Sequence, residues 1–396
     1  MMFLIVVITI LSLMYGYVGW RLIVPAAFSV SVNILLWGAL LLFAALPFVA
    51  AITRFRGIDG IWLHIASWVG YFSFGFLTIV FAFILFKDLM FLLTVGAHKI
   101  FQFAQNLFGS GDMTTQAVDP ERRKLLLNSI NVGILGVTGA MTGYGMYQAM
   151  RIPDIVDIDI PINNLPNDLE GFRIAQITDI HISSIIKRWF VQGVVEKVNE
   201  LKPDLIALTG DLVDGSVRQL GNDVAPLADL NAPYGKYFIT GNHEYYSGVG
   251  QWLTETARLG FDTLLNEHRV IERGAGRMVL AGVTDFAGGQ FSKDHKSDPH
   301  KAIAGAPDGV KILLAHQPKS IYEAAKAGFD FVISGHTHGG QYFPYHFLVA
   351  LVQPYVRGLH KYKNTHIYVS KGTGHWGPQI RIGAKSEITV LRLVRG

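Results

Sequence analysis

Five short apolar segments from residue 172 onward each end at a small group of histidine, aspartate or asparagine residues. The segments are 172–178, 205–209, 237–240, 311–315 and 329–334. Their length, their apolar composition and the glycine or polar residues that follow them are typical of buried β-strands. We therefore expect five strand ends, each presenting one or two polar side chains.

The last segment is followed by a tight, glycine-rich loop that holds two histidines. Its sequence is Gly335-His336-Thr337-His338-Gly339-Gly340-Gln341. A histidine or aspartate after one strand would be unremarkable, because such residues commonly cap helices or bond to the backbone. Five such groups are different, since imidazole, carboxylate and amide groups are ligands of borderline and hard divalent cations. The pattern, in its strand-to-loop context, favours a metal site.

The order of these groups resembles the calcineurin-like metallophosphoesterase family from about residue 172 to the C-terminus. The signature of that family is D-x-H, G-D-x-x-D, G-N-H-[DE], a lone H and G-H-x-H. The matching residues in this chain are Asp179-Ile180-His181, Gly210-Asp211-Leu212-Val213-Asp214, Gly241-Asn242-His243-Glu244, His316 and Gly335-His336-Thr337-His338. All five parts are present in the family's order.

Within the family, the chain is most similar to the membrane-associated bacterial branch. The residues that carry this similarity are Gly339-Gly340-Gln341, Gly372-Thr373-Gly374, Pro378, Arg381 and Glu387-Ile388. That branch usually has prolines just before the last glutamate, where this chain has Lys385-Ser386, so the tail match is looser.

The resemblance implies a site for two metal ions. It assigns Asp179, His181 and His338 to one ion, Asn242, His316 and His336 to the other, and Asp211 to both as a bridge. The mixed nitrogen and oxygen ligands, without sulfur, suit manganese, iron or zinc better than magnesium alone.

The resemblance also implies hydrolysis of phosphate mono- or diesters by a hydroxide that bridges the two ions. His243 would contact a phosphoryl oxygen or protonate the leaving alkoxide as a catalytic residue, and otherwise would only orient its neighbours. Asp214 and Glu244 would accept hydrogen bonds from ligand imidazoles and fix their tautomers.

The first 150 residues contain long, nearly uncharged apolar runs. Runs 1–20, 32–52 and 66–86 each approach the ~20 residues that span a bilayer, and 129–149 makes a further span. Residues 88–108 begin apolar and become polar, so they fit an interfacial helix or a fifth span, with a weak preference for five spans. Mean hydropathy is +0.32 and only 16% of residues are charged, which suits a multi-pass membrane protein.

The basic segment Glu121-Arg122-Arg123-Lys124 precedes the last apolar run. Short basic loops stay in the cytoplasm, so the last span would exit and leave the C-terminal domain outside the cytoplasm. Arg122-Arg123 also resembles a twin-arginine export signal, but its internal position makes an ordinary basic anchor the simpler interpretation.

We therefore predict an α/β chain with three parts. Residues 1–150 form a bundle of four or five transmembrane helices, 151–170 a linker and edge strand, and 171–396 the metallophosphoesterase domain. Helical stretches between the strands favour an alternating α/β layout. The family resemblance sharpens this to a sandwich of two mixed sheets flanked by helices.

The apolar segment 342–352 lies directly after the histidine loop. It fits either a buried helix or strand, or a lip that enters the membrane surface or holds an acyl chain. The lipid bilayer and a phosphate ester, with lipid-linked esters among the substrates, are the expected partners. No basic, aromatic-interleaved block indicates nucleic acid, and the net charge is only +4.

Three functions stay open at this point. The first is a phosphodiesterase or phosphatase on the extracytoplasmic side of the membrane. The second is a pyrophosphatase acting on a nucleotide-linked lipid at the cytoplasmic face. The third is a non-enzymatic membrane sensor that binds phosphate, against which the intact ligand set argues.

Overall fold

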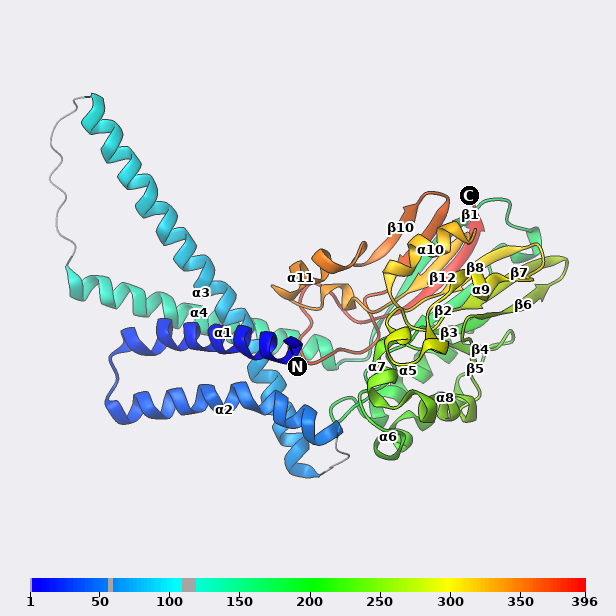
Figure 1. The fold of residues 1–396 in the computed structure, drawn as a ribbon, viewed down its shortest axis with the longest axis horizontal. Coiled ribbons are helices and arrows are strands. Elements are labelled where there is room, and N and C mark those ends of the chain that lie inside the picture. Colours follow the sequence, from blue (N-terminus) through cyan, green and yellow to red (C-terminus); the bar gives the residue numbers. More distant parts are fainter. Residues whose placement is uncertain (1, 56–59, 109–118) are drawn as a thin grey trace. The chain divides into compact units, whose positions relative to one another are not determined.

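The computed structural model describes residues 2–55, 60–108 and 119–396, so Met1 of the first predicted span lies outside the described residues. The chain divides into two compact units (Figure 1). The helical unit comprises the described residues up to Ala50 and Trp68–Gly143. The two-sheet unit comprises the described residues of Ala51–Ser67 together with Tyr144–Gly396.

Four long helices make up the N-terminal part of the chain: α1 (Met2–Ala26), α2 (Val30–Phe55), α3 (Ile61–Phe108) and α4 (Pro120–Met150). Each contains a stretch long and apolar enough to cross a membrane, the longest being Ile61–Gln105. Residues 88–108 continue α3 without a break, so the separate interfacial helix or fifth helix considered from the sequence does not form.

Apolar side chains hold the helical unit together. Met14 and Val18 of α1 are buried with Leu77 and Val80 of α3 in one cluster. α1 and α2 also approach closely, since a Cβ at Gly19 would lie only 2.6 Å from the ring of Trp37. Most other large apolar side chains of these helices are exposed, as expected for surfaces that meet lipid.

The first sheet of the two-sheet unit has the strand order β1-β12-β2-β3-β4-β5. Its strands are β1 (Asp154–Ile162), β2 (Arg173–Ile177), β3 (Leu205–Leu208), β4 (Lys236–Phe238), β5 (Asp262–Thr263) and β12 (Glu387–Arg395). The strands β2 to β5 are parallel, whereas β12 runs antiparallel to β2 and parallel to β1. β1 is therefore an edge strand.

The second sheet has the order β10-β11-β9-β8-β7-β6. Its strands are β6 (Glu267–Arg273), β7 (Gly276–Gly282), β8 (Val310–Leu314), β9 (Phe331–Ser334), β10 (Gly358–Tyr362) and β11 (Thr365–Val369). The central strands β7, β8, β9 and β11 are parallel, and the two edge strands are antiparallel to their neighbours. Central parallel strands read as continuous apolar runs because both of their faces are buried.

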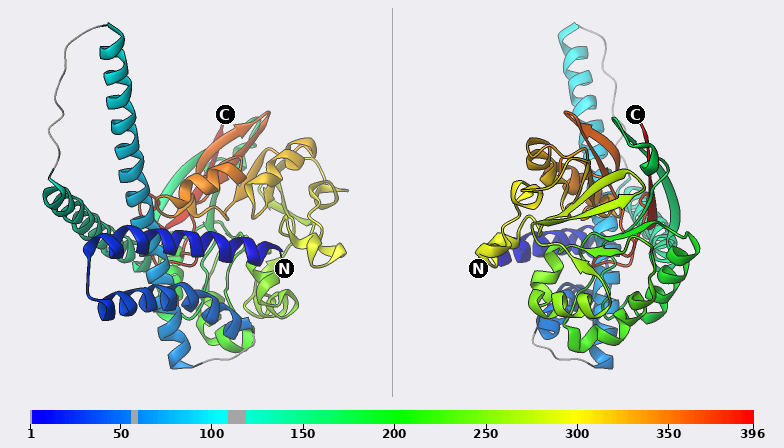
Figure 2. Two further views of the ribbon diagram at one scale, coloured as in Figure 1. Left: turned by 60° about the vertical axis from the view of Figure 1, so that its left-hand side comes forward. Right: turned by 90° about the vertical axis from the view of Figure 1, so that its right-hand side faces the viewer.

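The two sheets pack face to face around one core (Figure 2). Ile174 and Leu205 of the first sheet share this core with Ile312 and Ile333 of the second. Seven helices complete the unit: α5 (Arg188–Glu200), α6 (Val217–Val224), α7 (Asn242–Ser247), α8 (Val249–Arg258), α9 (Pro299–Ile303), α10 (Ile321–Lys326) and α11 (Tyr345–Val352).

Helices cover the outer faces of both sheets. The apolar side of α5, including Phe190 and Val194, packs with β2 and β3 residues, and Ile321 of α10 packs with Leu313 on the second sheet. The predicted α/β sandwich of two mixed sheets flanked by helices is therefore confirmed. The five strands expected from the sequence are β2, β3, β4, β8 and β9, and each ends where its polar group begins.

Candidate metal centre

The backbone at the strand ends is held in an uncommon conformation. Asp179, His181, Asp211, His336 and His338 all have positive φ angles, between 50° and 73°. Few residues other than glycine adopt this region, although aspartate and histidine tolerate it better than most. Residues kept in such conformations cluster at functional sites, where the surrounding structure holds them. All five belong to the predicted ligand set.

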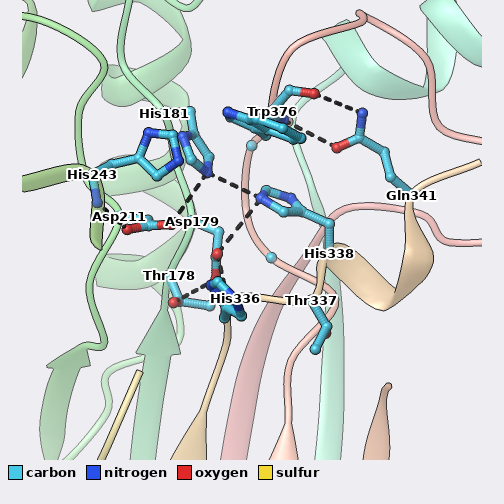
Figure 3. Close-up of polar contacts among 12 residues, drawn as sticks. Thr178, Asp179, His181, Asp211, His243, His336, Thr337, His338, Gln341 and Trp376 are labelled. Carbon is cyan, nitrogen blue, oxygen red and sulfur yellow. Dashed lines mark hydrogen bonds and ion pairs between the residues drawn. The ribbon is translucent and has the colours of Figure 1, made fainter. Parts of the chain in front are cut away.

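Two of the predicted ligand groups form compact clusters, the first of which is drawn in Figure 3. In the first, His181 Nε2 lies 3.0 Å from His338 Nε2, and His338 Nε2 lies 3.5 Å from Asp179 Oδ1. All three residues are buried. Burial lowers the pKa of His338 well below its usual value, and the neighbouring His181 adds to this, so its imidazole is neutral. Neutral imidazole is the form that binds metals.

The second cluster contains Asp211, His316 and His336. His316 Nδ1 donates to the carbonyl oxygen of Thr209 at 2.8 Å, which directs Nε2 into the site. That Nε2 lies 3.2 Å from His336 Nδ1 and 3.1 Å from Asp211 Oδ2. Burial, reinforced by His316, lowers the pKa of His336 to about 3.

Asp211 lies between the two clusters. Its Oδ2 is 3.8 Å from His181 Nε2 of the first cluster as well as 3.1 Å from His316 Nε2 of the second. Burial opposes ionisation of this carboxyl, but His316 and His243 outweigh burial and hold its pKa well below the usual value. The carboxylate is therefore charged and available to both groups of imidazoles.

Asn242 has a buried oxygen that suits a cation. It is the first residue of α7 and is 8% exposed. Within the described residues, its Oδ1 accepts no hydrogen bond. A buried oxygen without a donor costs about 1–3 kcal/mol, and a hard or borderline cation would remove that cost. The donor set as a whole, imidazole nitrogens with carboxylate and amide oxygens, fits two divalent ions.

Glycines allow the strand ends to come this close together. A Cβ at Gly335 would lie 2.2 Å from Asp179 Oδ2, and a Cβ at Gly210 would lie 2.5 Å from the backbone nitrogen of Gly241. Any side chain at either position would push the ligand-bearing loops apart. The glycines of the G-D and G-H motifs are therefore required by packing.

His243 and His181 share one carboxylate. Nδ1 of each ring contacts Oδ1 of Asp214, at 3.2 Å for His181. Burial disfavours a charged His243, but Asp211 and Asp214 outweigh it and raise the pKa of His243 to about 9. The atoms of His243 also come close enough to those of His181 and Asp211 for the ring to serve as a ligand.

The structure corrects the role expected for Glu244. Its carboxylate accepts hydrogen bonds from the backbone nitrogens of Gly241, Asp211 and Leu212, at 2.6, 3.0 and 2.8 Å, rather than from ligand imidazoles. From the first turn of α7, this glutamate reaches back to the N–H of Gly241 at the helix start. The same carboxylate also reaches the N–H groups of the loop after β3. Glu244 thus joins the loop before α7 to the loop after β3 through backbone N–H groups of both. Asp214, by contrast, contacts the imidazole of the predicted ligand His181, as expected, and also that of His243.

A buried arginine supports the histidine loop from behind. Arg381 is 1% exposed, and its guanidinium donates to the carbonyl oxygens of His338, Lys371, Gly374 and Ala384. Its Nη2 also donates to Nδ1 of His338. Arg381 was not predicted as a site residue, because it lies far from the histidine motif in the sequence.

Two further residues near the site were not assigned a role from the sequence. The ring of Trp376 lies 6.1 Å from that of His243, and Gln341 holds the Trp376 backbone through two hydrogen bonds of 2.9 and 3.0 Å (Figure 3). His375 is buried, and neither ring nitrogen has a hydrogen-bond partner within the described residues. Burial lowers its pKa to about 3. No local signal distinguishes these residues from core residues.

The helix α11 corresponds to the apolar segment after the histidine loop. Both ends of this helix contact residues beside the clusters. A Cβ at Gly340 would lie 2.4 Å from the Cβ of His346, and Nε2 of Gln353 lies 3.5 Å from Oε1 of Gln317. Yet Phe347, Leu348, Leu351 and Val352 are all more than half exposed, so the segment is not a core element. Leu351 and Val352 line a groove of about 470 Å³ with Phe286, Lys319 and Tyr322.

Comparison with known proteins agrees with this geometry. The family model for calcineurin-like phosphoesterases matches residues 172–340. The chain is 36% identical over 302 residues to an uncharacterized metallophosphoesterase of Helicobacter pylori, an alignment that covers 74% of this chain and 78% of that protein. It is 30% identical over 280 residues to an uncharacterized metallophosphoesterase of Bacillus subtilis, with 68% and 95% covered.

The name of a vertebrate relative refers both to a transmembrane protein and to a metallophosphoesterase domain. This chain is 37% identical over 262 residues to a transmembrane protein with metallophosphoesterase domain of Danio rerio, and the alignment covers 64% of this chain. The chain spans only 60% of the length of that relative. The family predicted from the sequence is confirmed, and this chain belongs to the calcineurin-like metallophosphoesterases.

Proposed function

We propose that this chain is a membrane-anchored phosphoesterase that hydrolyses phosphate mono- or diesters with two divalent cations. The observation that carries the proposal is the position of Asp211, which lies between two clusters of buried imidazoles. We assign Asp179, His181 and His338 to one ion, Asn242, His316 and His336 to the other, and Asp211 to both. Manganese, iron and zinc are the ions best suited to these donors.

When bound, two such ions supply Lewis acidity at phosphoryl oxygens and lower the pKa of water toward neutrality. The chain's own contribution is a positioned acid. His243 is tied to Asp214 through Nδ1, so Nε2 is the nitrogen that can face a substrate. With a pKa near 9 the ring is protonated at neutral pH, and it can donate to a phosphoryl oxygen or to the leaving alkoxide.

We propose a lipid-linked phosphate ester as the substrate. Support comes from the exposed apolar side chains of α11, which is fastened beside both ligand clusters. Apolar surfaces of this kind mark contacts with membranes or acyl chains. The helix α4 ends at Met150 and β1 begins at Asp154, so three residues join the last candidate span to the first sheet.

We place the two-sheet unit on the extracytoplasmic side. The proposal rests on Arg122, Arg123 and Lys124, which are exposed at the start of α4 and would stay in the cytoplasm. The competing location is the cytoplasmic face, where a nucleotide-linked lipid would be cleaved at its pyrophosphate bond. A topology reporter fused to the C-terminus separates the two, because a reporter active only in the cytoplasm would contradict our assignment.

The test of activity uses the purified full-length protein in detergent, with manganese added or chelated. We expect hydrolysis of bis(p-nitrophenyl) phosphate that depends on the metal, and hydrolysis of at least one vesicle-borne phospholipid or lipid-linked phosphate. Absence of hydrolysis with manganese, iron and zinc on every ester would contradict the enzymatic proposal and favour a sensor.

The proposal that the substrate is lipid-linked is tested with a separate variant. Replacement of Phe347 and Leu348 by serine removes apolar surface from α11 without touching the clusters. We expect at least a tenfold loss on vesicle-borne substrate and no change on the soluble ester. Trp189→Ser, which removes an apolar side chain from α5 that is 52% exposed, is the matched control. Equal activity of the double variant and the wild type on vesicles would show that α11 does not recruit lipid.

A further inference from the structure

The helical unit contains a group of polar side chains among its apolar ones. Asp88 of α3 accepts hydrogen bonds from the hydroxyl of Tyr17 and from Nη2 of Arg21, both on α1. The neighbouring Lys87 donates from Nζ to Oδ1 of Asn131 on α4 at 2.7 Å. Asn131 in turn donates to the carbonyl oxygen of Arg21 at 3.0 Å. Three helices therefore meet at this group.

The group carries an excess positive charge. Among the described residues, Asp88 is the one carboxylate paired with Arg21 and Lys87, and its Oδ1 lies 3.9 Å from Lys87 Nζ. Asp88 and Glu121 are the only acidic residues in the sequences of the four helices. Within the described residues, the buried Nε of Arg21 has no hydrogen-bond partner. Ionisable groups among membrane helices are costly unless paired, so an additional anion is expected here.

One member of the group, Arg21, lies near the end of a candidate span. Arg21 is five residues from the end of the span Ile5–Ala26, which is about 8 Å along a helix. The Arg21 guanidinium lies 5.3 Å above the ring of Trp20, which is 54% exposed, and tryptophan is enriched at headgroup level. Arg123 lies over the ring of Phe91, one turn beyond Asp88. The basic segment of α4 therefore lies close to the same level of α3 as this group.

We propose that Arg21 and Lys87 bind the phosphate of an anionic phospholipid headgroup from the leaflet next to Arg122–Lys124. Their side chains are 28% and 15% exposed, so neither is fully enclosed by the helices. Guanidinium and ammonium groups are the usual partners of phosphate, and basic pockets between membrane helices suit anionic headgroups. Asp88 and Tyr17 orient the arginine, whereas Asn131 holds the lysine.

The experiment compares the full-length protein in nanodiscs of phosphatidylglycerol mixed with phosphatidylcholine and of phosphatidylcholine alone. Lipid retained by the released protein is counted by native mass spectrometry. Lys87→Gln should lower retention of phosphatidylglycerol about fivefold, the effect of roughly one basic group near a membrane surface. Lys99→Gln, at an exposed position of the same helix, is the matched control and should leave retention unchanged.

A second variant should change the retention of phosphatidylglycerol in the opposite direction. Asp88→Asn removes the only carboxylate of the group, so it should raise retention of phosphatidylglycerol severalfold. If the ion pair served only to stabilise the protein, Asp88→Asn would not raise retention of phosphatidylglycerol and the wild type would show no lipid selectivity. Either result would overturn the proposal. Excess inorganic phosphate is the third arm. If it raises the melting temperature as much as phosphatidylglycerol does, the ligand is soluble phosphate and the headgroup assignment is wrong.

Discussion

Arg381 donates a hydrogen bond to Nδ1 of His338 at 3.0 Å, which reverses the usual polarity of a metal-binding histidine. Ligand histidines commonly donate their second N–H to a carboxylate or carbonyl. A guanidinium has no acceptor, so His338 Nδ1 must accept and the ring proton lies on Nε2, facing His181. Metal binding through Nε2 would require that this proton pass to solvent, and the adjacent positive charge of Arg381 would stabilise the imidazolate that remains.

Replacing Arg381 should therefore weaken metal binding beyond any loss of stability. Arg381→Gln is expected to lower the affinity for one of two ions by about 10- to 100-fold, the range found when groups that orient ligands are removed. Titration of the metal-free protein followed by calorimetry measures this effect. Arg392→Gln, at a side chain that is 53% exposed, is the control. Two unchanged binding steps in Arg381→Gln would show that the arginine only supports the loop.

The shared position of Asp211 predicts a change in metal stoichiometry. Asp211→Asn should reduce bound metal from two ions to one or none, because the amide cannot supply a charged oxygen to both clusters. Activity should fall by on the order of a hundredfold or more, since several kcal/mol of transition-state stabilisation depend on the ions. Metal analysis of the purified protein decides the point. His300→Ala, an exposed histidine, should retain both ions; two ions in Asp211→Asn would refute a bridging role.

His243 can be tested as a catalytic group distinct from a ligand. His243→Ala should lower kcat by roughly 10²- to 10⁴-fold, the contribution of a positioned acid, while leaving two ions bound. Loss of an ion in this variant would instead make His243 a ligand, an arrangement that its distance from His181 and Asp211 permits. Asp214→Asn should show a smaller fall in kcat, because the ring stays in place but its pKa is no longer raised by that carboxylate.

The close approach at Gly335 predicts a structural defect. Gly335→Ala would place a methyl group 2.2 Å from Asp179 Oδ2 and 2.4 Å from Thr178 Oγ1, so both strand ends must move. We expect destabilisation of about 1–3 kcal/mol, together with loss of metal from the first cluster. Thermal unfolding with and without manganese measures both effects. Gly250→Ala in α8, where nothing lies within 4 Å, should be neutral or stabilising.

The strands and the groups of polar side chains at their ends could be predicted because both are local features. An apolar run such as 329–334 and the histidines after it are contiguous in the sequence, and the family order identifies their partners. Arg381 and Trp376 could not be found in this way, since their contacts with His338 and His243 join residues far apart in the chain. Glu244 was misassigned because its neighbours in the motif are ligands, whereas its carboxylate serves backbone groups.

The unbroken length of α3 also could not be predicted from the sequence, for a physical reason. Lys87 and Asp88 interrupt an apolar run, and two adjacent charges ordinarily indicate the end of a span. In the structure they are satisfied by Arg21, Tyr17 and Asn131 from other helices, so the helix continues past them. Contacts between helices cannot be inferred from composition alone.

The three residues between Met150 and Asp154 would restrict where the proposed membrane enzyme can search for its substrate. An extended chain of this length reaches only about 11 Å, so the first strand follows closely on the last candidate span. A substrate dissolved in the bilayer would meet the site by diffusion in two dimensions and at a high effective concentration. The short connection would not raise the effective concentration of a soluble ester. In the proposed membrane enzyme, the short connection would thus favour substrates dissolved in the lipid before any side chain of the site touches them.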